Sequence, residues 1–155
     1  MDHLAKKGPF EEAYFKAKVV SWLERGGDIN ETRLWKEGHT LLMIACIQNH
    51  EALCAELLQR GAALDMKGKG GKTALMHAAI HGNKGCVDML LQAGARANIR
   101  ADVDDSDFTE FDGLTARECV EEQLRITGKR PRLPEIVHML QVAEALQQQH
   151  DAQRR

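Results

Sequence analysis

Two histidines and a cysteine stand close enough in the sequence to suggest a metal site. His77 and His81 are four residues apart, which places them on one face of a helix, and Cys86 follows shortly after. Nitrogen and sulfur donors of this kind bind zinc, but no further ligand follows at a fixed spacing. A half-buried histidine beside an exposed one explains the pair better. We therefore expect no bound metal and no cofactor.

Two further segments resemble ligand-binding loops and fail on their spacing. The glycine- and lysine-rich segment 68–73 would need a glycine five residues before Gly71 to hold a nucleotide phosphate, and Met66 stands there. The acidic segment 102–107 has an aspartate where a calcium loop needs its glycine, and Gly113 where the loop needs its glutamate. Neither segment therefore predicts a nucleotide or calcium site.

The sequence contains no arrangement typical of a catalytic centre. It lacks a nucleophile elbow, a carboxylate pair at a defined spacing, and a cysteine with an adjacent histidine that could activate it. Cys46, Cys54, Cys86 and Cys119 form no C-x-x-C pair. We therefore expect a protein that is not an enzyme, with four free and buried thiols in a reducing compartment.

Composition limits the remaining classes of function. The chain of 155 residues is long enough for one domain, and 43% hydrophobic residues with 28% charged ones are typical of a globular protein. A formal net charge of -2 argues against a nucleic-acid binder. The longest apolar run, residues 41–47, is too short to span a bilayer, and Glu11 and Glu12 interrupt any signal peptide. We expect a monomer in the cytoplasm or nucleus, with no membrane partner.

An internal repeat organises the chain. Residues 38–46 align with residues 71–79, and residues 57–62 align with residues 90–95, both at an offset of 33. The same offset in two separate blocks indicates a repeat array. Each unit predicts two short helices, because the apolar residues follow helical spacing and are bounded by capping and left-handed residue types. The bounding residues are Thr40, Asn49 and Gly61 in one unit and Thr73, Gly82 and Gly94 in the next. The residues expected to be buried between units are Leu42, Ala45, Leu53, Leu57, Leu75, Ala78, Val87, Leu90 and Val137.

The two repeated blocks resemble the ankyrin repeat. Thr73-Ala74-Leu75-Met76-His77-Ala78-Ala79 is similar to the T-P-L-H-x-A core of that family, and Gly94-Ala95-Arg96-Ala97-Asn98 to its G-A-D-x-N ending. The resemblance covers roughly residues 17–142 and implies one all-α solenoid domain of two good repeats between two degenerate ones. Its units are roughly 1–32, 33–67, 68–100 and 110–146, with an insertion at 101–109 and a polar tail at 147–155 that we expect to fray.

The resemblance also implies a partner-binding face, since the turn tips and first helices of ankyrin arrays form a concave surface that binds another protein. The positions in this sequence are Trp35, Lys36, His39, Ile47, Gln48, Lys69, Lys72, Ile80, His81, Phe111 and Leu114. Large apolar side chains at positions expected to face water favour a binding role. Trp35 has an alternative, which is to fill the core of the degenerate first unit.

These residues predict an adaptor or scaffold whose partner is another protein. Two alternatives remain open: a small inhibitor that masks the surface of an enzyme, and a structural subunit of a larger assembly. The insertion and the residues directly after it contain six acids, at positions 102, 104, 105, 107, 110 and 112, with Phe108 and Phe111 among them. We expect it to dock on a basic surface of the partner. The competing explanation is pairing with Lys67, Lys69 and Lys72 of the preceding turn, a role that needs neither phenylalanine.

Overall fold

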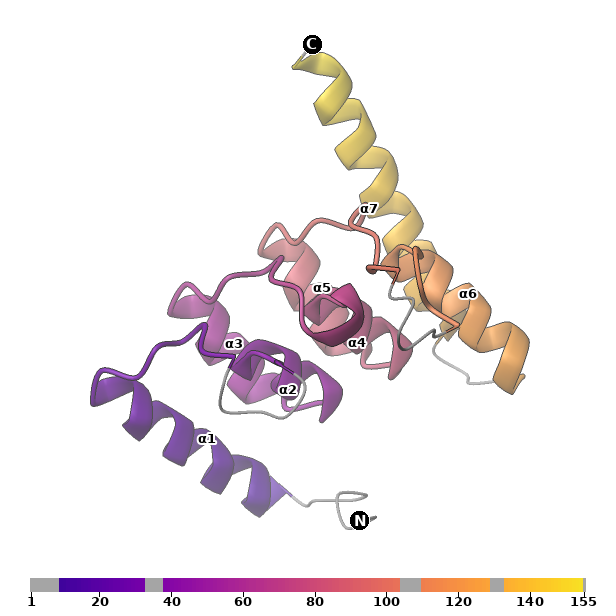
Figure 1. The fold of residues 1–155 in the computed structure, drawn as a ribbon. Helices are drawn as coiled ribbons and strands as arrows, with labels where there is room; N and C mark the ends of the chain where they lie inside the picture. Colours follow the sequence, from indigo (N-terminus) through magenta and orange to yellow (C-terminus); the bar gives the residue numbers. More distant parts are fainter. Residues whose placement is uncertain (1–8, 33–37, 104–109, 129–132, 155) are drawn as a thin grey trace.

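The computed structural model describes residues 9–32, 38–103, 110–128 and 133–154 (Figure 1). Several residues of interest in the sequence lie outside these ranges, namely Trp35, Lys36, Asp104, Asp105, Asp107 and Phe108. The α-helices of the described residues are α1 (Pro9–Glu24), α2 (Leu41–Ile47), α3 (Glu51–Gln59), α4 (Ala74–Ile80), α5 (Lys84–Gln92), α6 (Ala116–Thr127) and α7 (Leu133–Gln153). A short 3-10 helix, η1, spans Lys69–Gly71.

The helices form two layers of an open array. Helices α2, α4 and α6 stack in one layer, called the inner layer below, and α1, α3, α5 and α7 stack in the other, the outer layer. Across the layers, α2 pairs with α3, α4 with α5, and α6 with α7. Figure 1 shows the units following one another along the array, joined by extended turns on one side. Within the described residues the one isolated β-bridge joins Arg100 to Thr115, so the expected all-α solenoid is confirmed.

Threonine caps begin the inner helices. The hydroxyl oxygens of Thr40 and Thr73 accept hydrogen bonds from the backbone N–H groups of Met43 and Met76, at 3.3 and 3.4 Å. These contacts satisfy donors that the first turn of a helix leaves unpaired. At the start of α6, the Thr115 hydroxyl accepts a hydrogen bond from the Glu118 N–H. The Glu118 carboxylate in turn accepts one from the Thr115 N–H, which completes a capping box. The caps predicted at Thr40 and Thr73 are confirmed.

Left-handed residues end the inner helices, as the sequence predicts. Asn49 has a φ of 56° and Gly82 a φ of 74°, and both residue types adopt this conformation at low cost. Gly61 and Gly94 follow the ends of α3 and α5 with φ values of 80° and 95°. Each inner helix therefore reverses into an outer helix over a turn of only a few residues, which keeps the two layers in register.

The core lies between the layers and is continuous along the array. Eight of the nine residues expected to be buried are buried. The exception is Val137, which is half-buried. Helix α7 begins at Leu133, so its buried stripe runs through Leu133, Ile136 and Leu140, at spacings of three and four. Val137 lies at the border of that stripe, and the prediction for this residue was wrong.

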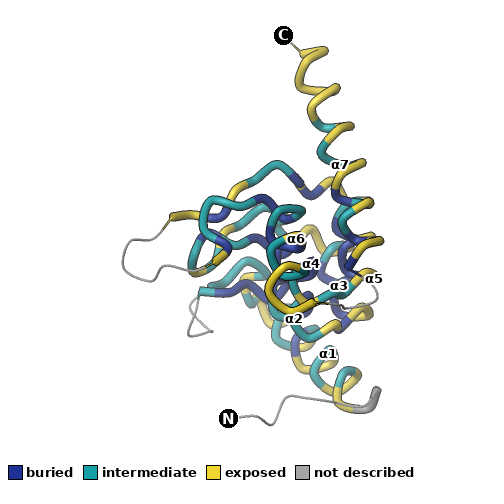
Figure 2. The backbone as a smooth tube through the Cα atoms, turned by 90° about the vertical axis from the view of Figure 1, so that its right-hand side faces the viewer, coloured by how far each residue is buried: buried dark blue, intermediate teal, exposed yellow. Residues whose placement is uncertain are grey.

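Helix α7 extends through most of the polar tail. It continues as a helix to Gln153, and its last turns project beyond the array and consist mainly of exposed residues (Figure 2). The Gln147 side chain fixes this extension: its oxygen accepts from the Ala97 N–H at 3.0 Å, and its nitrogen donates to the Ala95 carbonyl at 3.1 Å. The two hydrogen bonds attach this part of α7 to the backbone of the preceding unit, which favours continuation of the helix to this point.

Side-chain oxygens also link successive turns. Asn30 accepts a hydrogen bond from the backbone N–H of Ala63, and Asp65 accepts one from Arg96, at 2.9 and 3.0 Å. Both acceptors stand four residues after the glycine that ends an outer helix. The next equivalent residue is Asn98, whose side-chain oxygen is buried and accepts no hydrogen bond from the described residues.

Candidate functional site

The ends of α2 and α4 place matching side chains on neighbouring units. Ile47 and Ile80 are the last residues of these two helices, at the repeat offset of 33, and both are half-buried. Gln48 and His81 follow at the C-caps, with Gln48 partly exposed and His81 exposed. Because α2 and α4 pack side by side, these four residues occupy equivalent positions at the ends of neighbouring helices.

The turn before α4 supplies the cationic part of the predicted site. Lys69 lies in η1 and is exposed, whereas Lys72 is partly buried and its Nζ lies 5.2 Å from the centre of the Phe111 ring. Phe111 itself is only 8% exposed, so its expected exposure to a partner was wrong. The ring is covered within the protein, where the ammonium group and the aromatic face attract each other. Leu114, close to it in the chain, is half-buried.

His39 was also expected at the surface and is buried instead. A Cβ built on Gly68 would lie 2.9 Å from its Cδ2 atom, so the turn of the next unit sits directly on this ring. The rings of His39 and His77 meet edge to face, with centroids 4.8 Å apart and an angle of 75°. Burial, together with the smaller effect of the nearby charges of His39, His81 and Lys72, lowers the pKa of His77 to about 3. His77 is therefore a neutral packing residue at physiological pH.

The histidines and cysteine of the possible metal site do not come together. The His81 Nδ1 donates to the backbone carbonyl of His77 at 2.8 Å, so that nitrogen carries a proton. The His77 and His81 rings lie 6.4 Å apart. Cys86 lies in a separate cluster of thiols, where its sulfur meets those of Cys46 and Cys54.

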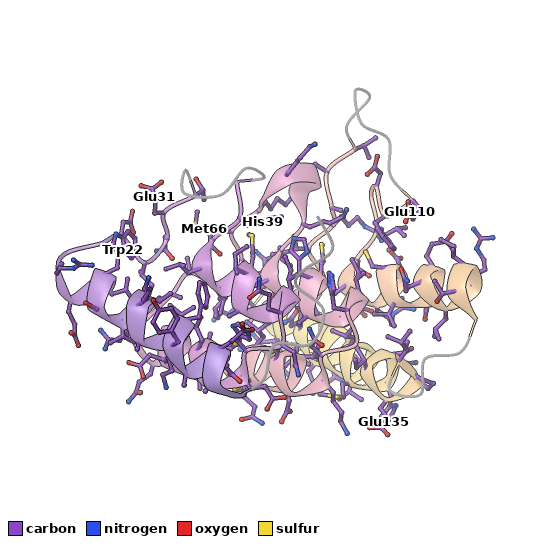
Figure 3. All side chains as sticks on the ribbon, turned by 90° about the horizontal axis from the view of Figure 1, so that it is seen from below. Trp22, Glu31, His39, Met66, Glu110 and Glu135 are labelled. Atoms are coloured by element: carbon purple, nitrogen blue, oxygen red, sulfur yellow. The ribbon has the colours of Figure 1, made fainter. Side chains whose placement is uncertain are left out.

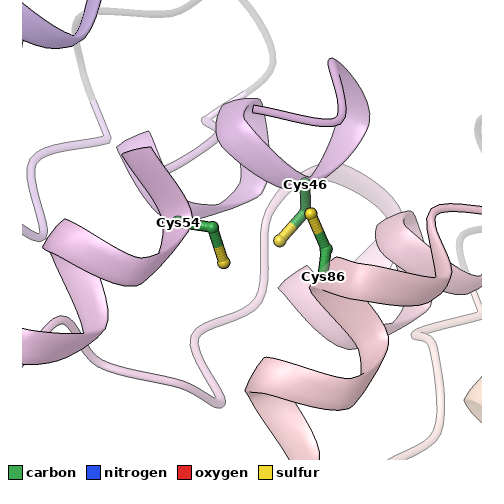
Figure 4. Close-up of side chains that lie close together, drawn as sticks. All are labelled: Cys46, Cys54 and Cys86. Atoms are coloured by element: carbon green, nitrogen blue, oxygen red, sulfur yellow. The ribbon is translucent and has the colours of Figure 1, made fainter. Parts of the chain in front are cut away.

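This thiol cluster is a feature that the sequence reasoning missed. Cys46 comes from α2, Cys54 from α3 and Cys86 from α5, and all three are fully buried with sulfur atoms within 4.8 Å of one another (Figure 4). Hydrogen bonds from Cys46 and then from Cys86 lower the pKa of Cys54, because they stabilise its thiolate. The available signal was the spacing of 32 residues from Cys54 to Cys86, which brings equivalent helices of adjacent repeats together.

Asp102, the first acidic residue of the insertion, contacts the turn that precedes α4. The Lys67 Nζ lies 2.6 Å from the Asp102 Oδ1, and the Asp102 N–H donates to the Gly70 carbonyl at 3.2 Å. Gly71 allows this approach, since a Cβ there would lie 2.2 Å from the Asp102 nitrogen. Internal pairing with the basic turn is therefore present at Asp102. Because Phe111 packs under Lys72, an internal role does use one phenylalanine, contrary to the expectation.

In Figure 3, Glu31, Met66 and Glu110 lie along the edge that carries the turns, and Glu135 lies on the opposite edge. Glu135 accepts a hydrogen bond from the Lys84 Nζ, which ties the start of α7 to the start of α5. No helix of the described residues combines the length and the apolar character needed to cross a membrane.

A search of curated proteins finds no match to the sequence. A comparison with protein families does find one, and it agrees with this geometry. The family described as ankyrin repeats (3 copies) matches residues 12–101, which contain most of α1 and all of α2 to α5. Beyond the matched residues, α6 and α7 continue the same two layers. Stacked helix pairs with threonine-capped inner helices and a 33-residue repeat are the features of that family, and the chain belongs to the ankyrin-repeat family.

Proposed function

We propose that this chain is an adaptor that binds another protein through the surface formed by the ends of α2 and α4 and the turns beside them. Ankyrin repeats are generally protein-interaction modules. The observation that carries the proposal is the repetition of Ile47 with Gln48 and Ile80 with His81 on adjacent helices. Partly exposed apolar side chains bordered by polar ones are typical of the centre of an interface.

The proposed contact residues differ from the sequence prediction in two places. His39 and Phe111 are buried, and we assign them the role of supporting the surface from beneath. The proposed contacts among the described residues are Ile47, Gln48, Lys69, Lys72, Ile80, His81 and Leu114. Trp35, Lys36 and Phe108 belong to the proposal on sequence grounds alone, since they lie outside the described residues.

Three further properties belong to the same proposal. A binding role without catalysis fits an array whose histidines are engaged in packing or backbone contacts, as His77 and His81 are. A reducing compartment, the cytoplasm or nucleus, fits four thiols that are free. A monomer binding one partner fits a linear array in which neighbouring units supply each other's core.

The test is to capture the partner with the wild-type chain, identify it by mass spectrometry, and measure its affinity for variants. Ile80→Glu should weaken binding at least tenfold, since it places a charge in the interface. Val142→Glu is the matched control, because Val142 is 46% exposed on α7 in the outer layer. Equal affinities of both variants, with unchanged melting temperatures, would contradict the proposed surface.

Trp35 requires a separate measurement. Trp35→Ala should weaken binding of the same partner by about 2 kcal/mol while leaving the free energy of unfolding nearly unchanged. Lower stability with unchanged affinity would instead assign Trp35 to the core of the first unit. The identity of the captured partner also separates the alternatives, since an inhibitor would lower the activity of a captured enzyme and a structural subunit would co-purify in a defined stoichiometry.

A further inference from the structure

The buried thiols of Cys46, Cys54 and Cys86 form a ready set of metal ligands in the core of the array. They come from three helices and two repeats, and their sulfur atoms turn toward one another (Figure 4). We propose that these three cysteines bind one thiophilic metal ion, of the class that includes Zn(II) and Cu(I). This inference is independent of partner binding, since none of the three side chains reaches the proposed contact surface.

The distances suit such an ion. Three sulfurs within 4.8 Å of one another enclose a point that lies within about 2.8 Å of each of them. Zinc–sulfur bonds are about 2.3 Å long, so each sulfur would move by about half an ångström or less. Rotation about the Cα–Cβ and Cβ–S bonds, with small shifts of the helices, supplies a movement of this size.

The surrounding contacts hold two of the three ligands in place. The side-chain nitrogen of Asn83 donates to the carbonyl oxygen of Cys46 at 2.6 Å, which fixes the end of α2 against the start of α5. The Cys86 thiol lies 3.9 Å from the Oδ1 of Asn49, at the limit of a sulfur hydrogen bond. Asn49 is exposed, so a side chain that borders the cluster also reaches the surface at the α2–α3 turn.

The binding step is a ligand exchange without electron transfer. The ion gives up bound water, up to three S–H bonds break, the same number of sulfur–metal bonds form, and the released protons pass to solvent. Soft thiolate sulfur selects Zn(II), Cu(I) and related ions over Mg(II) and Ca(II), which prefer oxygen.

Cys119 provides the matched control. It is also buried and free, but it lies on α6 outside the cluster. Reduced protein, freed of metal under anaerobic conditions, is titrated with Zn(II) and with Cu(I) against competing chelators. The wild-type chain and Cys119→Ala should bind about one equivalent of at least one of these ions. Cys54→Ala and Cys86→Ala should bind it at least about 10-fold more weakly, since loss of even an outer-sphere partner weakens metal sites that much.

A second measurement uses the wild-type chain alone and does not depend on the folding of a variant. Thiol alkylation is followed by mass spectrometry with and without one equivalent of the bound ion. The ion should slow alkylation of Cys46, Cys54 and Cys86 together and leave the rate at Cys119 unchanged. Two results would overturn the proposal: no binding of either ion to the folded chain, or equal effects on Cys119 and on the three clustered cysteines.

Discussion

Asn83 is the N-cap residue of α5, yet its side chain caps the end of a different helix. Its Nδ2 donates to the carbonyl oxygens of Cys46 and Ile47 at 2.6 and 3.3 Å, and it makes no side-chain cap for its own helix. The last carbonyls of a helix have no donor within the helix, and here the Asn83 amide supplies one. One amide group therefore terminates a helix of one repeat and attaches the next repeat to it.

Asn83→Ala should lower the free energy of unfolding by about 1–2 kcal/mol, because it leaves partly buried carbonyl groups without a donor. Urea unfolding followed by circular dichroism measures the change. Gln92→Ala is a suitable control, since its side chain is exposed and donates a hydrogen bond to Asp88 of the same helix. A loss in Asn83→Ala no larger than in this control would show that water replaces the amide without cost.

Ala78 tests how closely the inner helices approach. It is fully buried on α4, which packs between α2 and α6. Ala78→Leu should destabilise the protein by about 1–3 kcal/mol, because the added carbons have no space in a close-packed core. Ala55→Leu is the control, since Ala55 is exposed on α3 and the same substitution there should change stability little. Calorimetric melting of both variants measures the difference, and equal melting temperatures would contradict the packing described.

His77 makes stability depend on pH. Its pKa is about 3 in the folded protein, below the value near 6.5 of an unburied histidine, so the unfolded chain binds the proton more readily. The contribution of neutral His77 is fully present above pH 6.5 and falls by about 1.4 kcal/mol per pH unit as the pH drops from 6.5 towards 3. His77→Gln should flatten the curve of unfolding free energy against pH in this window. The exposed His138, changed to Gln, should leave the slope as in the wild type.

Phe111 should contribute to stability more than to binding. Phe111→Ala should cost about 3 kcal/mol of unfolding free energy, because it removes a buried ring. Lys72→Ala should cost about 0.5–1 kcal/mol, the value of an ammonium group over an aromatic face at a partly exposed site. Chemical denaturation of the two variants and the wild type gives both values. A Phe111→Ala variant with wild-type stability and weakened partner binding would restore the original assignment of this residue to the interface.

The local features of the fold follow directly from the sequence. Thr40, Thr73, Asn49 and Gly82 act where their residue types predict, because capping and left-handed turns depend on a few adjacent residues. The offset of 33 fixes which residues of neighbouring units are equivalent, and so it also predicts that Ile47 and Ile80 share one surface.

Features that depend on contact between units were harder to predict. His39 is buried because Gly68 of the next turn approaches it closely. The Phe111 ring lies beneath the Lys72 ammonium group of a neighbouring unit. The thiol cluster requires three helices to meet, and residue type alone gives no sign of that. The error at Val137 has a similar origin. The buried face of α7 runs through Leu133, Ile136 and Leu140, and the last unit departs from the repeat pattern that would have indicated this face.

Helix α1 has weaker anchorage than the rest of the array, and this gives the protein a preferred order of opening. Among its described side chains only Val19 is buried, and its polar links to α3 and the cap of α3 lie at the surface. They include the 3.2 Å contact of Glu12 with the Ala52 N–H and the ion pairs of Lys16 with Glu56 and of Glu24 with Arg60, at 3.7 and 4.0 Å. In a linear array each unit is held by its neighbours, so the least anchored end detaches first. The amides of α1 should therefore exchange with deuterium ahead of those of α4, and a protease acting on the native chain should first remove residues before α2.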